Sequence, residues 1–366
     1  MGRRPVIDGG DPPGGAATLA CMVARLADIA AQAGVSEATV SRVLNGRPGV
    51  ADSTRQSVLT ALAVLGYERP VRLRSHAAGL VGLVVPELDN PIFAAFVQVV
   101  APALARQGYS AVLCTATPGG LTEDQYIRML LERGASGILF VSGLHADVGA
   151  DPARYRALRA LGLPIVLVNG PLDGVDAPFV STDDAASMDL AVTHLVALGH
   201  TRIGLAVGPR RFAPVVRKVA GFTAALSRCL GAPDPAAWVE SAMFTVEGGA
   251  LAAERLLARG ATAIVCGSDL MALGAVRTAR TRGLAVPRDV SVVGSDDSPL
   301  MAFTDPPLTT VRQAVQAMGA AAVQALLDEI SGVPVDGGEY LFRPELVVRA
   351  STGAAPAAAP RAVSAV

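Results

Sequence analysis

The sequence is poor in the residues that build metal centres, disulfide frameworks and membrane spans. It has four cysteines, with no C-x-x-C spacing, and four scattered histidines, with no H-E-x-x-H pair. It also lacks a run of about eighteen apolar residues, the length that a transmembrane helix requires. These absences argue against a metal site and a membrane span, and they favour cysteines that pack as reduced thiols.

Signatures of nucleotide binding and covalent catalysis are missing as well. Gly119-Gly120 is not part of a G-x-x-x-x-G-K-[ST] phosphate loop, and no nucleophile is paired with a histidine. We therefore expect no catalytic residues and no cofactor, and predict that the protein is not an enzyme. Aromatic residues make up only 4% of the chain, with a single tryptophan, which disfavours a ligand site built on ring stacking.

Charge is distributed unevenly along a chain that is long enough for two or three domains. The formal net charge is −1 over 366 residues, and 51% of the residues are hydrophobic. The first 75 residues hold nine arginines and six acidic residues, a net +3, which leaves −4 for the remainder. These values predict a globular protein whose N-terminal part is modestly suited to DNA.

The stretch Leu26–Asn45 has the pattern of two short helices joined by a tight turn. Apolar residues recur at helical spacing before Gly34, which readily adopts the left-handed conformation that ends a helix. Ser36 is placed to cap the second helix, and Val40 and Val43 mark its buried stripe. This geometry brings a second helix into a DNA major groove, although an ordinary helical hairpin has the same pattern. The outward positions of the second helix are Glu37, Ala38, Ser41, Arg42 and Asn45.

Three motifs occur together in this region. Asp28–Asn45 reads D-I-A-x-x-A-G-V-S-x-x-T-V-S-R-V-L-N, Val50–Arg55 reads V-x-x-x-T-R, and Leu65–Tyr67 reads L-G-Y. On these motifs the chain resembles the lac-repressor (LacI/GalR) family of transcriptional regulators, and the resemblance extends from Arg25 to Thr352. It implies an N-terminal all-α helix-turn-helix DNA-binding domain over residues 25–68. The DNA contacts that the pattern and the resemblance together predict are Ser36, Glu37, Ala38, Thr39, Ser41, Arg42, Asn45, Tyr67 and Leu73.

Residues 69–78 form a basic linker between the predicted DNA-binding domain and the rest of the chain. In the family this region is a hinge helix that inserts a leucine into the minor groove, and Leu73 corresponds to that leucine. The linker is shorter than usual here and lacks the usual run of small residues, so a flexible tether is the alternative.

Both ends of the chain have compositions that do not favour a fold. Residues 1–24 are rich in Gly and Pro, and Arg3-Arg4 followed by Ala16–Ala24 superficially resembles an export signal. The apolar part is short, and a DNA-reading motif follows it at once. We expect a disordered extension or an upstream start, since Met22 lies where family members usually begin. The tail 353–366 is rich in Ala and Pro and is also expected to be disordered.

From Gly79 onward, apolar strands alternate with helical stretches in two consecutive series. This alternation predicts two lobes, each with a doubly wound parallel sheet. The resemblance implies that they form an α/β, periplasmic-binding-protein-like core, with the helix Val315–Ile330 returning to the first lobe and Glu339–Val348 completing the second. The expected boundaries are 79–180 and 310–333 for the first lobe, and 181–309 and 334–352 for the second.

Polar side chains follow the carboxyl ends of the predicted strands, where open parallel sheets bind ligands. Carboxylates and amides there suit hydrogen bonds to vicinal hydroxyls, so a sugar is the leading effector and a purine the second. Lys218 stands where the family usually has a ligand-contacting arginine, and Ser268 replaces a common asparagine. Caps, turns and core packing are the alternative roles for these residues. The predicted effector contacts are Asp89, Asn90, Phe93, Thr115, Ser142, Asn169, Asp183, Arg217, Lys218, Ser268, Asp269 and Asp296.

The sequence therefore predicts a cytoplasmic transcriptional regulator, most simply a repressor, whose affinity for double-stranded DNA is set by a small molecule bound between the lobes. A homodimer and a near-palindromic operator are expected, because two-fold protein symmetry is mirrored in the DNA site. A sugar-binding protein of a transport system is the alternative, because it shares the two-lobed core. The helix-turn-helix pattern argues against that alternative.

Overall fold

The computed structural model describes residues 26–44, 50–65, 79–115 and 119–357, which belong to two compact units that divide near His76. The predicted contacts Asn45, Tyr67 and Leu73, the linker 69–78 and residues 1–24 lie outside the described residues. No helix in the described ranges is long and apolar enough to cross a membrane.

In the N-terminal unit, residues 26–44 and 50–65 form three helices, α1 (Leu26–Ala33), α2 (Glu37–Leu44) and α3 (Asp52–Val64). Gly34 has a φ of 67°, and the amide of the next residue donates to the carbonyl of Ala30 over 3.0 Å, so the chain reverses at once after α1. The buried contacts of this unit come from all three helices and are made by Ile29, Ala30, Val40, Val43, Val58 and Ala61.

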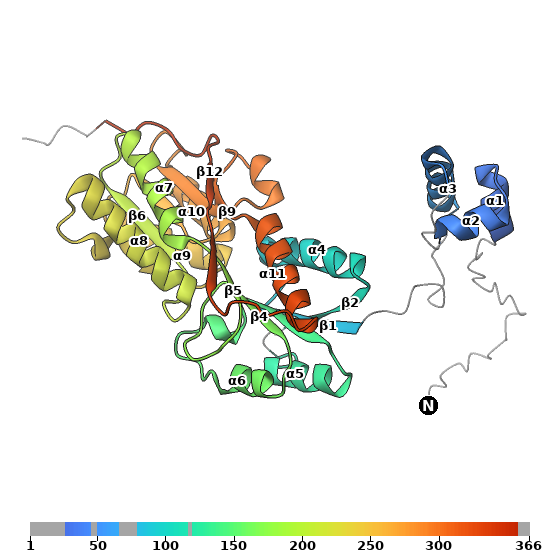
Figure 1. Ribbon diagram of the computed structural model, residues 1–366. Helices are drawn as coiled ribbons and strands as arrows, with labels where there is room; N and C mark the ends of the chain where they lie inside the picture. Colours follow the sequence, from blue (N-terminus) through green and yellow to red (C-terminus); the bar gives the residue numbers. More distant parts are fainter. Residues whose placement is uncertain (1–25, 45–49, 66–78, 116–118, 358–366) are drawn as a thin grey trace, which may run out of the picture. The chain divides into compact units, whose positions relative to one another are not determined.

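The first lobe of the larger unit is built on a six-stranded parallel sheet (Figure 1). The strand order is β11-β5-β4-β3-β1-β2. The strands are β1 (Gly79–Val85), β2 (Tyr109–Thr115), β3 (Gly137–Val141), β4 (Ile165–Val168), β5 (Phe179–Thr182) and β11 (Glu339–Phe342). The central strands β1, β3 and β4 are buried because helices cover both of their faces.

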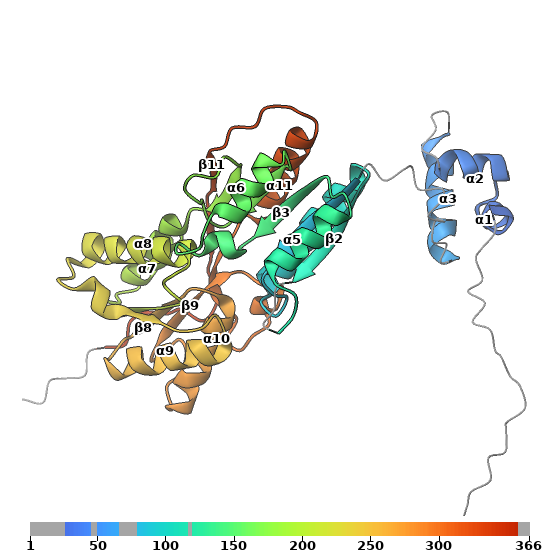
Figure 2. The ribbon, with the colours of Figure 1, turned by 90° about the horizontal axis from the view of Figure 1, so that it is seen from below.

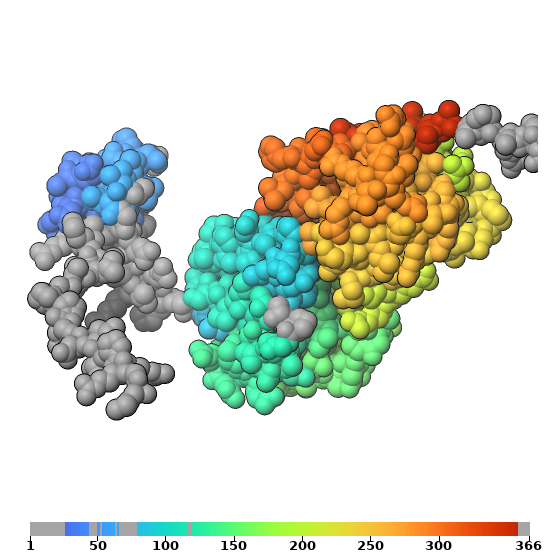
Figure 3. Space-filling model, turned by 180° about the vertical axis from the view of Figure 1, so that it is seen from behind, coloured from blue at the N-terminus to red at the C-terminus, as the bar shows by residue number. Residues whose placement is uncertain are grey.

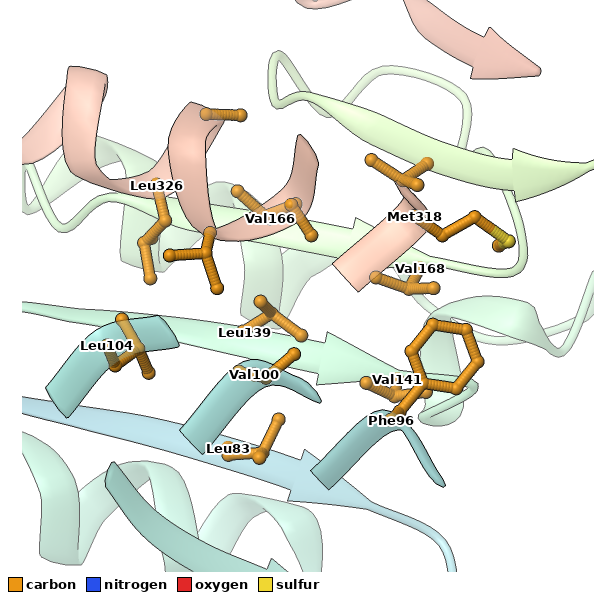
Figure 4. Packing of buried hydrophobic residues seen from close by; sticks show 14 of the residues in the cluster. Leu83, Phe96, Val100, Leu104, Leu139, Val141, Val166, Val168, Met318 and Leu326 are labelled. Atoms are coloured by element: carbon orange, nitrogen blue, oxygen red, sulfur yellow. The ribbon is translucent and has the colours of Figure 1, made fainter. Parts of the chain in front are cut away.

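Four helices cover the two faces of this first sheet: α4 (Pro91–Arg106), α5 (Glu123–Glu132), α6 (Ala153–Ala160) and α11 (Val315–Ile330). Figures 1 and 2 show α4 and α11 on one face and α5 and α6 on the other. Figure 4 shows Val100 of α4 beside Leu139 of β3, with Phe96 of α4 near Val141 and Met318 of α11 near Val168. The late helix α11 thereby completes the core of a lobe that the chain began more than two hundred residues earlier.

The second lobe repeats this plan with a sheet of order β12-β10-β9-β8-β6-β7, in which only the pairing of β12 with β10 is antiparallel. Helices α9 and α10 pack in one core cluster and α7 and α8 in another, on opposite faces. The strands are β6 (Ile203–Val207), β7 (Val239–Ser241), β8 (Ala263–Cys266), β9 (Ser291–Asp296), β10 (Thr309–Arg312) and β12 (Glu345–Val347). The helices are α7 (Asp184–Ala197), α8 (Ala213–Leu230), α9 (Val246–Ala258) and α10 (Asp269–Thr281). Both lobes are doubly wound, as predicted.

The chain passes between the lobes three times, after β5, after β10 and after β11. This corrects the expected division of the C-terminal part, because 334–352 is not a single segment of the second lobe. Residues 339–342 pair in parallel with β5 in the first sheet, and only β12 joins the second. The residues from Thr309 to Arg312 pair with β9, so the second lobe extends beyond the expected boundary at 309. Figure 3 shows the two lobes meeting along one boundary.

Candidate functional site

In the N-terminal unit, the second helix presents polar side chains away from the three-helix core. Val40 and Val43 are buried, whereas Glu37, Ala38 and Arg42 are exposed. The remaining predicted contacts, Thr39 and Ser41, are half-buried. The structure therefore places short side chains and one guanidinium on the accessible surface of α2, a combination suited to base edges and phosphates.

Ser36 precedes α2 and caps its first turn. The Thr39 amide donates to the Ser36 Oγ over 3.2 Å, and the two hydroxyl oxygens lie 3.0 Å apart. Such a cap orients the first turn of the helix and removes one unsatisfied amide. The hydroxyl stays exposed while it caps, so the capping role and the predicted DNA contact are compatible.

In the first lobe, two predicted effector contacts meet where strands β3 and β4 end. Ser142 and Asn169 both have a positive φ, 49° and 69°. The side-chain Nδ2 of Asn169 donates to the Ser142 Oγ over 3.0 Å. Residues other than glycine adopt this conformation at some energetic cost, and such residues gather at ligand sites. The side-chain Oδ1 of Asn169 has no partner among the described hydrogen bonds, which leaves a hydrogen-bond acceptor at this edge of the sheet.

Four further predicted contacts of the first lobe follow strands β1 and β2. Asn90 is buried and caps α4, accepting from the Ile92 amide over 3.3 Å, while Asp89 is exposed beside it. Phe93 is half-buried and packs against the first-lobe core, which is the structural role considered for it. Thr115, at the end of β2, is also half-buried.

A buried polar network lies behind Ser142, and the sequence analysis did not identify it. Tyr155 donates to the Glu123 Oε1 over 2.5 Å, and the amide of Leu144 donates to the Glu123 Oε2 over 3.0 Å. The His145 Nε2 bonds the Val168 carbonyl over 2.9 Å. Through these bonds, the network holds the turn after β3, which contains Ser142, against the end of β4. Glu123, His145 and Tyr155 are widely spaced in the sequence, so no local motif marks them.

In the second lobe, Ser268 and Asp269 begin α10 and are both buried. The Ser268 Oγ accepts from the Met271 amide over 3.3 Å as a helix cap. Asp269 accepts from the Thr310 hydroxyl over 2.6 Å and from the Ser298 amide over 2.7 Å. Burial raises the pKa of Asp269 to about 6 against the effect of these donors. This carboxylate joins three segments of the second lobe at the strand ends.

Asp296 ends β9 in a left-handed conformation, with a φ of 111°, and its side chain is bridged to the first lobe. Gln313 donates to the Asp296 Oδ1 over 2.7 Å, and its own Oε1 accepts from Thr182 at the end of β5 over 2.8 Å. Burial, reinforced by the negative charge of Asp269, raises the pKa of Asp296. Gln313 lies in a chain crossing, so one amide side chain connects the strand ends of both lobes. Sequence reasoning missed Gln313 because no motif accompanies the short strand β10 that precedes it.

Lys218 and Asp184 form an ion pair between α8 and α7, and both are buried. Burial raises the pKa of Asp184, and Lys218 opposes that rise. Asp183, the neighbouring predicted contact, caps α7 by accepting from the Ala186 amide over 2.9 Å. The negative charges of both Asp184 and Asp269 and the positive charge of Lys218 act on Asp296, so these groups surround a common region.

Arg217 is directed at the first lobe. Its two terminal nitrogens donate to the two carboxylate oxygens of Glu339 on β11, over 2.6 and 2.8 Å. Although burial acts in the opposite direction, these bonds hold the pKa of Glu339 below its usual range. Arg217 thus links α8 of one lobe to the edge strand of the other.

The fold and this site define a class: a helix-turn-helix unit on one chain with a two-lobed α/β core whose strand ends carry polar, partly strained residues. Residues 25–69 match the lacI family of bacterial regulatory proteins, and residues 192–352 match a periplasmic binding protein-like domain. The chain is 63% identical to the HTH-type transcriptional regulator reg1 of Streptomyces lividans over 92% of its length and 98% of that protein. The chain belongs to the LacI family of DNA-binding transcriptional regulators.

More distant relatives and solved structures agree. The HTH-type transcriptional repressor CytR of Escherichia coli K12 is 32% identical over 91% of this chain and 97% of its own length. The structure of a transcriptional regulator CelR–cellobiose complex has a TM-score of 0.67 at 32% identity, covering 89% of this chain and 99% of that chain. A lac repressor dimer bound to operator and the anti-inducer ONPF has a TM-score of 0.66 at 29% identity, covering 90% and 99%.

Proposed function

We propose that this regulator is a homodimeric repressor of the cytoplasm, and that a sugar bound at the strand ends of the two lobes sets its affinity for a near-palindromic operator. The observation that carries the proposal is the bridge from Asp296 through Gln313 to Thr182. A ligand that contacts Asp296 acts on a group already bonded to the other lobe. Such a ligand shifts how the lobes are arranged by as much as its affinities for the arrangements differ.

The effector contacts of the proposal are the predicted ones. Their chemistry supports a polyhydroxyl ligand, because carboxylate and amide oxygens on several strand ends accept hydrogen bonds from adjacent hydroxyls. Solved relatives in complex with cellobiose and with ribose add support for a sugar. The transport-protein alternative lacks a use for the exposed polar face of α2, and the relatives are regulators.

The DNA half of the proposal is tested by selection from a library of random duplexes with the purified full chain. We expect enrichment of a near-palindrome whose half-sites are about one helical turn apart or a multiple of it. Recovery of no consensus, or of a consensus without two-fold symmetry, would contradict the proposed dimeric operator complex.

The sugar half is tested on the selected duplex. Thermal stabilisation by a panel of sugars, nucleobases and phosphorylated sugars identifies a ligand, which at a hundred times its Kd raises the free energy of unfolding by about 2.7 kcal/mol. That ligand is then expected to change operator affinity. Stabilisation by a nucleobase and not by any sugar would replace the proposed ligand class.

A further inference from the structure

Lys218 is the only lysine in the chain, while the other thirty basic side chains are arginines. It lies on α8 with 8% of its surface exposed, and its ammonium group is paired with the buried carboxylate of Asp184. An ammonium is a compact charge with three donors, whereas a guanidinium is a planar fork that pairs with carboxylates and phosphates. A lysine at this place in an arginine-dominated chain therefore suggests a specific requirement for its shape and charge.

We propose that the Lys218–Asp184 pair selects an effector without negative charge: a neutral polyhydroxyl compound, and not a sugar phosphate or sugar acid. This inference rests on the proposed function and specifies its ligand class. The pair acts as one electrically neutral unit, with Lys218 as the specificity-determining donor to a hydroxyl. Asp184 is buried, so its charge has to be balanced by the lysine in the free protein.

Three arginines at the strand ends are also paired with carboxylates. Arg217 is held by both oxygens of Glu339, and Arg312 and Arg349 are held by the two oxygens of Asp297, at 2.7 and 2.6 Å. Each of these guanidiniums already has a carboxylate partner. An incoming anion has to compete with that partner for every one of them.

In the part of the chain that the structure describes, the strand ends also carry carboxylates that form no ion pair with a basic side chain. Four of the predicted effector contacts are aspartates that form no ion pair among the described residues: Asp89, Asp183, Asp269 and Asp296. A phosphate placed near them meets like charge at each aspartate that is ionised. Burial raises the pKa of Asp269 and of Asp296, and a sugar hydroxyl can accept from a protonated carboxyl as well as donate to an ionised one.

Three more arginines follow strand ends, Arg210 and Arg211 after β6 and Arg343 after β11, and all three are exposed. Water and salt screen exposed charges strongly. They therefore do not offset the buried aspartates for a ligand that has to reach Lys218.

The binding mode follows from this arrangement. The ammonium of Lys218 uses one donor for Asp184 among the described contacts and has two left for hydroxyl oxygens. A phosphate would draw Lys218 toward itself and leave the buried Asp184 uncompensated. The loss of that partner is the source of the discrimination.

Calorimetric titration of the full-length protein tests the proposal. The probes are α- and β-linked glucose disaccharides, glucose and ribose, each measured beside its phosphate ester. For the sugar that binds, we expect the ester to bind at least a hundredfold more weakly. An ester that binds within tenfold of its parent sugar, or more tightly, overturns the inference and leaves the proposed sugar effector intact.

Two variants of α7 isolate the cause. Asp184→Asn uncovers the charge of Lys218, so the discrimination against the ester should shrink at least tenfold. Asp189→Asn is the matched control, because it uncovers Arg228 at an exposed pair between the same two helices. The control should keep the discrimination of the wild type. A folded Asp184→Asn protein with unchanged discrimination overturns the assignment, and if that variant does not fold, the wild-type comparison decides.

The single lysine provides a direct readout. Protein labelled with ε-15N-lysine has one side-chain ammonium resonance, and the bound neutral sugar should shift it. A sugar that binds by calorimetry and leaves this resonance unmoved overturns the role of Lys218. If no probe of the panel binds, and none alters operator affinity, the proposed function fails and this inference fails with it.

Discussion

The carboxylate of Asp296 is held in three ways at the level of single atoms. It is buried, it accepts from Gln313, and its residue has a φ that side chains rarely adopt. Together these features keep an acceptor at the end of β9 in a fixed orientation. Such a group is costly for the fold and useful for a ligand, which is the usual reason for its presence at a strand end.

Asp296→Ala should abolish the effector response while leaving effector-free operator affinity nearly intact. The substitution removes the proposed ligand acceptor and one end of the bridge through Gln313, and the DNA-reading helices belong to another unit. Operator titrations with and without the effector measure both quantities. A folded variant that responds normally and binds DNA poorly would show that Asp296 is a structural residue.

Arg42→Ala tests the recognition surface of α2. It should weaken specific operator binding by about 1–3 kcal/mol if Arg42 reads a guanine, and it should weaken binding to all sequences if it contacts phosphate. In the second case the slope of log affinity against log salt should shrink by about one unit. Arg133→Ala, which removes the same charge from an exposed position in the first lobe, is the control. Unchanged binding by the Arg42 variant would refute the assignment.

At the scale of elements, the turn after β3 depends on a buried histidine. Burial lowers the pKa of His145 to about 4, and its Nε2 bonds the Val168 carbonyl. Between about pH 6.5 and 4 the unfolded chain therefore binds a proton at this residue that the folded protein does not. The stability that His145 contributes is present above pH 6.5 and is lost as the pH falls toward 4.

His145→Gln removes this titration and retains a donor for the Val168 carbonyl. Between pH 7 and pH 5 the wild type should lose about 2 kcal/mol of unfolding free energy more than the variant does. Urea denaturation of both proteins at the two pH values measures the difference. Parallel losses in the two proteins would mean that His145 titrates normally in the fold.

The Arg217–Glu339 pair is a second element-scale device, because it joins α8 to the edge strand of the other lobe. A double-mutant cycle with Arg217→Ala and Glu339→Ala should give a coupling of about 1–2 kcal/mol in unfolding free energy, since two charge-assisted bonds form in a half-buried setting. The Arg154–Asp124 pair, which has one exposed partner, serves as the comparison and should stay below about 1 kcal/mol. Equal couplings would show that the half-buried position between the lobes does not strengthen the Arg217–Glu339 pair.

Element prediction from the sequence succeeded where the apolar pattern was long or the cap was explicit. The alternation of strands and helices from Gly79 onward and the turn at Gly34 were both predicted, and the structure has both. The sheet that receives residues 339–342 could not be predicted. A four-residue edge strand has too few apolar positions to favour one of two similar sheets, so the fold of the whole decides its partner.

Site prediction has a similar limit. Asp269 and Asn169 could be found because strand ends gather at one edge of a parallel sheet. Gln313 could not, because its bridge depends on a crossing between the lobes. The pairing of Asp184 with Lys218 could not either, because it depends on how two helices of one lobe pack against each other. Glu123, Tyr155 and His145 were missed for the same reason. Local patterns report caps and strands, and they do not report which distant side chains meet.

At the scale of the whole molecule, we propose that one ligand couples two activities of a single chain. The proposed ligand contacts lie in the two lobes of the core, and the predicted DNA contacts from Ser36 to Arg42 lie in the helix-turn-helix unit. Because the coupling is thermodynamic, the effector must alter operator affinity by the same factor by which operator alters effector affinity. This reciprocity distinguishes a coupled regulator from a protein that binds both ligands independently.

The most direct test is a pair of operator titrations of the wild-type protein, one with and one without a saturating neutral sugar identified by calorimetry. We expect the operator Kd to differ by about 5–150-fold between the two titrations, which corresponds to a coupling of about 1–3 kcal/mol. An operator Kd that is the same with and without a bound sugar would show that the protein does not couple the two ligands.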